Sequence, residues 1–509
     1  MIKNSEHLFF LIKSLSKAEK RSFKLFAKQH AKDGKNNYTL LFDAIDRMEA
    51  YDHSSLVKSM EGKMLTKNIS TIKVQLTELV LRSLRQNTSA LKLRVKLMQQ
   101  MDYLGILFEK GLYSQCKKML EKAKKMARDD DNYLALDRLA ILEFNIALKE
   151  LKPEDLEHYI NVTYPEVKEA RKTNDILAEF ECLTVQMRLL LLESNAIGGK
   201  LTKERLDKII QHPIMNLPIK EYPVTCQIDY HIIWGHYHYA MDHLSETYFH
   251  RKKALDLIEG SSAGERIWLT HARFLLTALT TFKMFDEFDK ELKHIKAIIN
   301  KTPKERRSTT YQAELDMTLN NIRFHRDLDE GNFETISSYL PELESIYKNA
   351  VNQIDTNLKM AFCFNLAYAY LGNQNYKKAL VWINKILNDS EMKNLRQDIQ
   401  AFARIMNLCV HYSLRNFDLI PSLIVSTERH LKKEDRYNDL ESVFLKFAHK
   451  HLTVPFVQAK KEVFEQESDH MLELCTTPEG KIALEYIDLP SWIKSVYKET
   501  TMESIVKGE

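Results

Sequence analysis

Apolar residues recur every three or four positions along most of this chain, the spacing that places them on one face of an α-helix. The clearest stretch covers residues 366–387. A first apolar face ends at Tyr370, a polar turn follows at residues 372–375, and a second apolar face begins at Tyr376. The pattern predicts two antiparallel helices whose joint apolar surface exceeds what one hairpin can bury, so neighbouring hairpins must cover the remainder.

This hairpin resembles the tetratricopeptide repeat (TPR). The residues at the leucine, small and aromatic positions of that motif are Leu366, Ala367, Tyr370, Tyr376 and Ala379. Cys363 stands where the motif has a tryptophan, and the closing proline is missing. The resemblance implies an array of helical hairpins whose first helices line a concave face that binds a peptide or a protein.

Weaker copies of the turn and its aromatic residue recur along the chain. The aromatic residues are Phe288, Phe333, Tyr376 and Phe417, at steps of 45, 43 and 41 residues. Because these steps exceed the usual TPR length of about 34 residues, we expect longer helices. The expected fold is all-α, an α-solenoid of TPR-like helical hairpins. It divides into a basic N-terminal helical domain at residues 1–88, the repeat array at 89–454 and a C-terminal helical cap at 455–509.

The composition favours the same fold class. The 509 residues include only 13 Gly and 11 Pro, and sheet-rich proteins need both residues in their turns. A hydrophobic fraction of 44% is enough for a large core. The six cysteines contain no C-x-x-C pair, and each lies in an apolar helical context. We therefore expect reduced, buried thiols in a cytosolic protein.

Positive charge is concentrated at the N-terminus. Residues 1–96 hold 19 Lys and Arg against 9 Asp and Glu, whereas the rest of the chain has a small negative balance. A basic segment of this kind indicates an anionic partner or docking of the segment on the rest of the chain. It is also what a solvated amphipathic helical bundle looks like.

One helix of this basic segment has the features of a nucleic-acid recognition helix. Lys73 near its start would approach base edges, and Lys67, Arg82 and Arg85 would meet phosphates. Proteins with a helix-turn-helix domain fused to a TPR array are a known domain architecture, which supports this alternative. The acidic segment at residues 43–49 and the lack of a tight Gly turn count against it.

No pattern in the sequence indicates catalysis. Four histidines form two pairs seven residues apart on one predicted helix: His231 with His238, and His236 with His243. Metal sites on helices favour spacings of three or four. Glu291 and His294 have the spacing of a di-metal bundle ligand pair, but no second copy accompanies them. We expect a non-enzymatic protein with no metal and no cofactor.

The expected function is that of an adaptor or scaffold. Carried over from the TPR motif, the ligand-facing positions of the first helices are Asn321, His325, Phe364 and Tyr368. An Asn amide can hydrogen-bond a peptide backbone, and aromatic rings can anchor apolar side chains. The expected partner is thus a protein or peptide, unless the chain's own superhelix buries this face. The alternative is a TPR-type regulator that binds nucleic acid through residues 1–88.

We expect a cytoplasmic protein that does not enter a membrane. No segment approaches the ~20 apolar residues of a membrane span, and the apolar run at residues 8–12 is too short for a signal-peptide core. Residues 14–27 and 486–495, SLSKAEKRSFKLFA and YIDLPSWIKS, are similar to the ends of a family of long TPR-like cytoplasmic proteins in Bacteroidota. That resemblance implies a bacterial protein and no particular activity.

Overall fold

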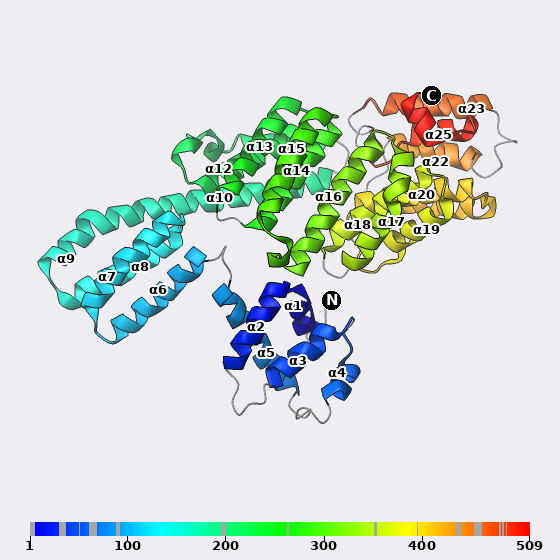
Figure 1. Cartoon of the computed structure of the whole chain (residues 1–509). Coiled ribbons are helices and arrows are strands. Elements are labelled where there is room, and N and C mark those ends of the chain that lie inside the picture. Colours follow the sequence, from blue (N-terminus) through cyan, green and yellow to red (C-terminus); the bar gives the residue numbers. More distant parts are fainter. Residues whose placement is uncertain are drawn as a thin grey trace.

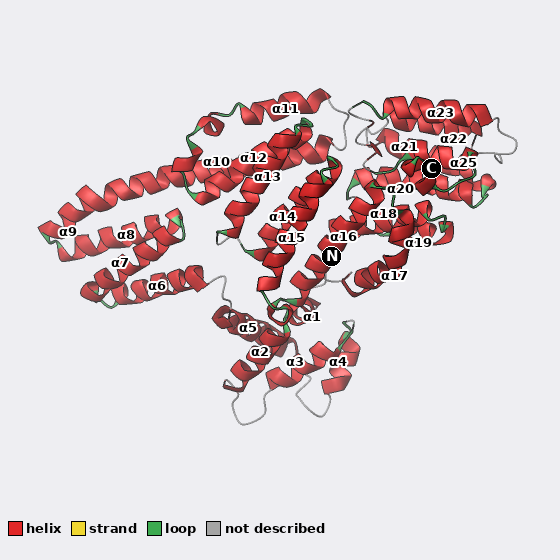
Figure 2. Ribbon diagram, turned by 45° about the horizontal axis from the view of Figure 1, so that its top comes forward, coloured by secondary structure: helices red, strands yellow, loops and turns green. Residues whose placement is uncertain are grey.

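The computed structural model describes residues 6–29, 37–49, 51–60, 69–87, 92–194, 200–261, 264–350, 354–393, 395–433, 439–451, 461–477, 480, 483–484 and 486–508. Regular structure within these residues is helical throughout, with no strand (Figure 2). The predicted all-α class is confirmed. No helix of the described residues is both long and apolar enough to cross a membrane.

The N-terminal helices, which we call the head, pack around their own core (Figure 1). They are α1 (His7–Ser14), α2 (Lys17–Gln29), α3 (Asn37–Arg47), α4 (His53–Met60) and α5 (Ile69–Asn87). Ser16 caps α2 reciprocally with Glu19, as a capping box does. The rings of Phe23 and Phe42 stack at 4.5 Å in the centre of the core. Both rings are almost fully buried, so they fix the packing of α2 on α3.

The next helices form a separate projection, the arm (Figure 1). They are α6 (Lys92–Glu109), α7 (Tyr113–Asp129), α8 (Tyr133–Glu150), α9 (Pro153–His158), a π-helical turn (Tyr159–Thr163) and the beginning of α10 (Tyr164–Ser194). Helix α10 is 31 residues long and packs on both α8 and α12. It therefore connects the arm to the remaining helices.

The largest part of the molecule is a stack of helical hairpins. Its helices are α11 (Lys200–Ile210), α12 (Val224–Ala240), α13 (Leu244–Glu259), α14 (Glu265–Thr281), α15 (Phe285–Lys301), α16 (Thr309–Asp329), α17 (Phe333–Ala350), α18 (Thr356–Gly372), α19 (Tyr376–Asn388), α20 (Gln397–Ser413) and α21 (Ile420–Lys433). From α12 to α21, the two helices of each hairpin pack on each other. The first helices of successive hairpins, α14, α16, α18 and α20, also touch in order.

The head rests on this stack. Helix α2 packs against a short 3₁₀ helix at Lys304–Arg306, and the Thr309 hydroxyl at the start of α16 donates a hydrogen bond to the Lys13 carbonyl. Docking of the basic segment on the rest of the chain, one of the alternatives that its charge left open, is thus part of the structure.

The hairpin turns share one backbone conformation. Residues in the left-handed region close five of them: Asp242, Lys283, Gly331, Gln374 and Arg415. In the last four turns an aromatic residue follows two positions later: Phe285, Phe333, Tyr376 and Phe417. The residue equivalent to Phe333 in the preceding turn is therefore Phe285. The sequence alignment on Phe288 was wrong, because Phe288 lies one helical turn further along α15 and is buried there.

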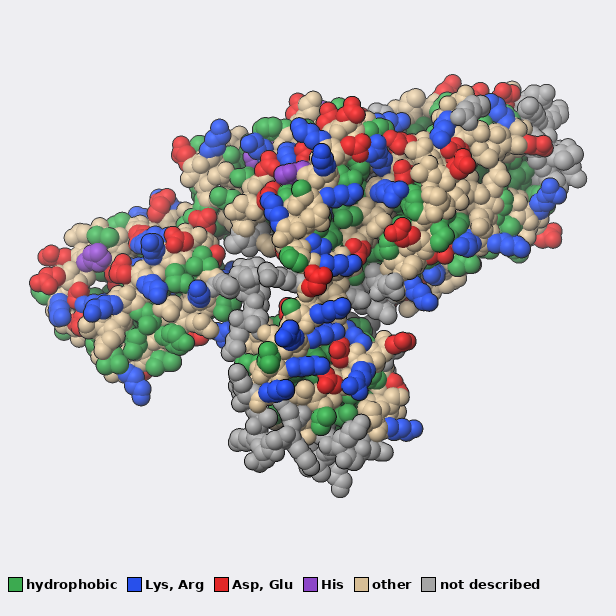
Figure 3. Space-filling model, in the orientation of Figure 1, with side chains coloured by type: hydrophobic (Ala, Val, Ile, Leu, Met, Phe, Trp, Pro, Cys, Tyr) green, Lys and Arg blue, Asp and Glu red, His purple; other side chains and the backbone are tan. Residues whose placement is uncertain are grey.

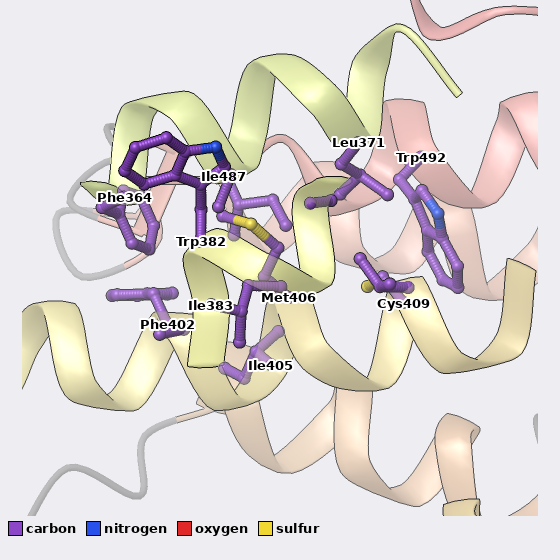
Figure 4. Close-up of a cluster of buried hydrophobic side chains, with 14 of the residues drawn as sticks. Phe364, Leu371, Trp382, Ile383, Phe402, Ile405, Met406, Cys409, Ile487 and Trp492 are labelled. Carbon is purple, nitrogen blue, oxygen red and sulfur yellow. The ribbon is translucent and has the colours of Figure 1, made fainter. Parts of the chain in front are cut away.

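The C-terminal helices complete the core of the stack. They are α22 (Asp439–His451), α23 (Lys461–Leu474), α25 (Leu489–Tyr497) and α26 (Met502–Lys507). Figure 4 shows Ile487 and Trp492 from this segment among buried side chains of α18, α19 and α20. Trp492 is 2% exposed. The last residues are therefore part of one continuous apolar core with the hairpins.

Five of the six cysteines are buried free thiols, as expected. Cys182 on α10 is the exception, because its side chain is exposed. The apolar sequence around it suggested burial, but α10 faces solvent on one side over much of its length.

Candidate functional site

Two of the proposed concave positions, Phe364 and Tyr368, lie on α18 and contact the chain's own C-terminal segment. Phe364 is 4% exposed, and its ring meets that of Tyr486 at 6.0 Å. The Tyr368 hydroxyl accepts a hydrogen bond from the backbone N–H of Asp488 at 3.2 Å. Burial raises the pKa of Tyr368 well above its usual value. A partner could reach Phe364 and the Tyr368 hydroxyl only by displacing residues 486–489.

The contacts of that segment make such displacement costly. The ring of Tyr486 stacks on Phe402 at 4.5 Å, and its hydroxyl donates to the Asp398 carboxylate at 2.6 Å. The same carboxylate accepts hydrogen bonds from the Arg396 guanidinium, including one of 2.9 Å from Nε to Oδ2. Trp492, a few residues later, is buried as well. Exposing side chains of this size costs about 1.5–3 kcal/mol each.

The other two concave positions, Asn321 and His325, lie on α16 and are half-buried. The Asn321 amide oxygen accepts a hydrogen bond from the Asn365 amide of α18 at 2.9 Å. His325 contacts the Asp329 carboxylate one turn along the same helix at 2.9 Å. These polar groups are thus used within the chain, and the structure does not gather the four concave positions into one open site.

The proposed nucleic-acid contacts that the structure describes, Lys73, Arg82 and Arg85, all lie on α5. Lys73 donates to the Tyr51 hydroxyl and lies 5.0 Å from the centre of that ring. Arg82 pairs with Glu78 on the exposed side of α5, and Arg85 is exposed. Lys67 lies outside the described residues.

A different helix presents the head's basic side chains most densely. Lys17, Arg21 and Lys28 are exposed along α2. Figure 3 shows Lys and Arg side chains gathered on this part of the head. Two further lysines of α2 pair with aspartates of α3, Lys20 with Asp46 at 2.6 Å and Lys24 with Asp43 at 2.7 Å. Helix α2 therefore has an exposed basic face, and aspartates of α3 neutralise part of its charge.

The histidines of α12 do not contact one another in the pairs that their seven-residue spacing suggested. His231 meets His250 of α13 with 2.9 Å between their Nδ1 atoms, and His238 meets His243 at 3.1 Å. Burial lowers the pKa of His231 to about 4 and that of His250 to about 3. Both rings are therefore neutral at neutral pH.

No group of three or more His, Cys, Asp or Glu side chains suited to a metal ion occurs among the described residues. Glu291, one half of the spacing noted in the sequence, is 2% exposed and pairs with Lys252 at 2.7 Å. Tyr248 donates a second hydrogen bond to it at 3.0 Å. This carboxylate has the partners of a structural ion pair.

Sequence reasoning missed the most exposed apolar surface of the arm, which lies on α8. Asn132 caps this helix by accepting a hydrogen bond from the Ala135 N–H. One face is buried in the core of the arm through Leu136, Leu139 and Ile146. The opposite face, which we call the α8 stripe, is solvent-exposed and consists of Leu134, Ile141, Phe144, Leu148 and Leu151. Leu134 is 63% exposed and Leu151 is 67% exposed.

The α8 stripe has the geometry of a coiled-coil seam. Leu134, Ile141 and Leu148 are seven residues apart, and Phe144 and Leu151 add a second set at the same spacing. This is the a and d pattern that pairs one helix with another. The signal was present in the sequence, since α8 is apolar on both faces and its own core needs only one of them.

Helix α6 adds further exposed apolar side chains to the arm. Met98, Tyr103 and Ile106 are between 45% and 59% exposed. Apolar side chains gather along α6 at the edge of the arm in Figure 3. Exposed apolar surface of this extent marks an interaction site more often than it serves stability.

Comparison of the chain with models of known protein families, with curated proteins and with solved structures gives no match.

Proposed function

We propose that this chain is a non-enzymatic adaptor or scaffold, a TPR-like α-solenoid that binds a protein partner. The succession of helical hairpins with equivalent left-handed turns supports the repeat interpretation. The observation that carries the binding function is the α8 stripe. The α16 and α18 positions first assigned to the ligand make contacts within the chain, so we place the binding surface on the arm.

The α8 stripe fits an amphipathic helix of the partner. A helix with apolar residues at heptad spacing would pack its own seam along Leu134, Ile141 and Leu148. Exposed cations lie along one edge of the stripe on the same helix, at Arg138 and Lys149. Asp137, at the d position between Leu134 and Ile141, is paired with Arg171 of α10 at 2.7 Å. The two cations favour acidic residues on the facing side of the partner helix.

Leu151 ends α8 in the left-handed conformation of a helix C-cap, with its N–H bonded to the Ala147 carbonyl. Its side chain is 67% exposed and extends the stripe to the end of the helix.

A designed peptide tests this proposal. The probe is an acidic amphipathic helix of about three heptads with leucine at a and d. Fluorescence anisotropy with the full-length chain measures its affinity. The variant Ile141→Ser/Leu148→Ser should weaken binding at least about 100-fold, because each lost apolar side chain contributes about 1.5 kcal/mol or more when buried.

Two controls separate specific docking from general stickiness. Val381→Ser/Val425→Ser removes equally exposed apolar side chains from α19 and α21 and should leave affinity unchanged. A peptide with the same composition in scrambled order should not bind. Equal binding of both peptides, or an equal loss in both double variants, would refute the α8 stripe as the docking surface.

The exposed basic row on α2 favours a second candidate function, nucleic-acid binding by the head. Binding of the full chain to random duplex DNA and to RNA over a salt series should then show a steep fall of log affinity with log salt. Arg21→Glu/Lys28→Glu should abolish it. Lys122→Glu/Lys125→Glu on α7 makes the same charge change at exposed positions elsewhere and should not. Absence of binding at low salt would remove this candidate.

A further inference from the structure

The turn between α12 and α13 brings two histidine side chains face to face. His238 lies in the last turn of α12, and His243 is the N-cap residue of α13. Asp242 between them has a φ of 60°, and the His243 N–H donates a hydrogen bond to the His238 carbonyl at 2.9 Å. The two imidazole Nδ1 atoms lie 3.1 Å apart at the exposed surface of this turn.

The same backbone arrangement recurs in the other hairpin turns, so the fold sets this contact. In each turn the N–H after the left-handed residue donates to the carbonyl five positions earlier, as Asn416 does to His411 at 2.9 Å. The side chains of Asn416 and His411 also meet, at 3.0 Å. Of these five turns, the one between α12 and α13 alone has histidine at both positions.

The surroundings keep the His238 ring fixed and neutral. Trp234 stacks on it, with ring centres 5.2 Å apart and ring planes at 20°. Burial, and after it the charge of His243, lowers the pKa of His238, so the neutral imidazole that binds metal ions dominates at neutral pH. Glu246, one turn after His243, is exposed and forms no ion pair within the described part of the chain. Its negative charge favours a cation near the two rings.

We propose that His238 and His243 bind one divalent transition-metal ion through their Nδ1 atoms. Metal–nitrogen distances of about 2.0–2.1 Å place an ion between nitrogens at this separation, with an angle of roughly 100° at the ion. Imidazole suits Cu²⁺, Ni²⁺ and Zn²⁺, whereas Mg²⁺ and Ca²⁺ prefer oxygen ligands. The proton that one Nδ1 shares with the other moves to Nε2 of its own ring when the ion binds, so both imidazoles stay neutral.

Two imidazoles are fewer ligands than a structural zinc site uses, so water occupies the remaining positions around the ion. The spacing along the sequence did not indicate this pair, because residues five apart on one helix point to different faces. Here the chain reverses between them. The proposal replaces the expectation of a chain without metal at this one place. It is separate from the α8 stripe, and neither proposal depends on the other.

Metal titration of the full-length chain tests the proposal. We use Cys182→Ser as the background, because that exposed thiol also binds these ions. Calorimetry with Cu²⁺, Ni²⁺ and Zn²⁺ should show one site of micromolar affinity, tightest for Cu²⁺, and Mg²⁺ should give no signal. Tryptophan fluorescence should fall as Cu²⁺ or Ni²⁺ binds, because the ion lies beside the indole of Trp234. Trp234→Phe should retain the binding and lose this part of the quenching.

Histidine variants locate the ion. His238→Gln and His243→Gln should each weaken binding at least about tenfold, because a single imidazole cannot chelate the ion. Glu246→Gln should weaken it by a few-fold for all three ions, because it removes a nearby negative charge. The matched control is His158→Gln/His294→Gln, which removes two exposed histidines of α9 and α15 and should leave affinity unchanged.

Either of two results overturns the proposal. One is the absence of saturable binding of all three ions at sub-millimolar concentration. The other is unchanged affinity and unchanged quenching in His238→Gln/His243→Gln, which would place the ion elsewhere. Far-ultraviolet circular dichroism checks that each variant is folded. If the double variant unfolds, His243→Gln alone decides, because that side chain is exposed and lies outside the core.

Discussion

The close contact between Gly372 and Phe333 allows a sharp test of how the hairpins pack. Gly372 ends α18, and a Cβ added there would overlap the ring of Phe333, the first residue of α17. Phe333 is 1% exposed, so its ring has no free space into which it could swing. The ring therefore requires glycine at position 372 for steric reasons.

The expected effect of Gly372→Ala is a net loss of stability. Alanine is preferred over glycine in a helix by about 0.8–1 kcal/mol, which would stabilise the variant. Overpacking a filled core costs typically about 1–3 kcal/mol. With the overlap falling on a buried ring, the second effect dominates, and we expect a loss of about 1–2 kcal/mol.

Urea titration followed by far-ultraviolet circular dichroism measures the change, and Gly105 supplies the control. A Cβ at Gly105, in the exposed middle of α6, meets nothing within 4 Å. Gly105→Ala should therefore stabilise the chain by about 0.5–1 kcal/mol. The two identical substitutions should act in opposite directions.

A double-mutant cycle identifies the cause. Phe333→Leu shortens the side chain that the added methyl group would strike, so Gly372→Ala should cost about 1 kcal/mol less in that background. A Gly372→Ala variant as stable as the natural chain would refute the steric reasoning. So would additive effects of the two substitutions.

Two further predictions follow from burial. The pKa values of His231 and His250 are lowered in the folded chain, so stability is fully present above the unfolded value of about 6.5 and is lost as pH falls below it. Between pH 7 and 5 we expect the free energy of unfolding to fall by on the order of 1–2 kcal/mol for each ring. The fall should be smaller in His231→Gln/His250→Gln. Urea titration at each pH measures it. A maleimide should label Cys182 rapidly in the native chain, with the other five thiols reacting only after unfolding, as counted by mass spectrometry.

The helical class and most hairpins could be predicted because their signal is local. Apolar spacing of three and four marks each helix, and the turn at residues 372–375 lies where the pattern predicted it. The alignment of repeats was harder. Phe285 and Phe288 are three residues apart on the same helix, and the left-handed residue that decides between them is Lys283, which no composition rule marks as a turn residue.

The fate of the concave positions could not be read from local sequence. Tyr368 and Asp488 are 120 residues apart, and their hydrogen bond depends on how the C-terminal segment crosses α18 and α20. Periodicity places Phe364 on a face of its helix but does not say which distant segment packs there. Contacts that are long-range in the chain require the folded structure.

The α8 stripe shows the opposite case, in which the apolar residues were visible in the sequence and their exposure was not. A helix with apolar side chains all round is usually buried on all sides. Helix α8 escapes that rule because α7 and α10 cover only one side of it, leaving the other side to solvent. The number of apolar positions in a helix therefore predicts how much apolar surface it presents. Only the folded structure shows how much of that surface the same chain buries. No described residue of the chain covers the second face of α8, which is why we propose that a partner binds there.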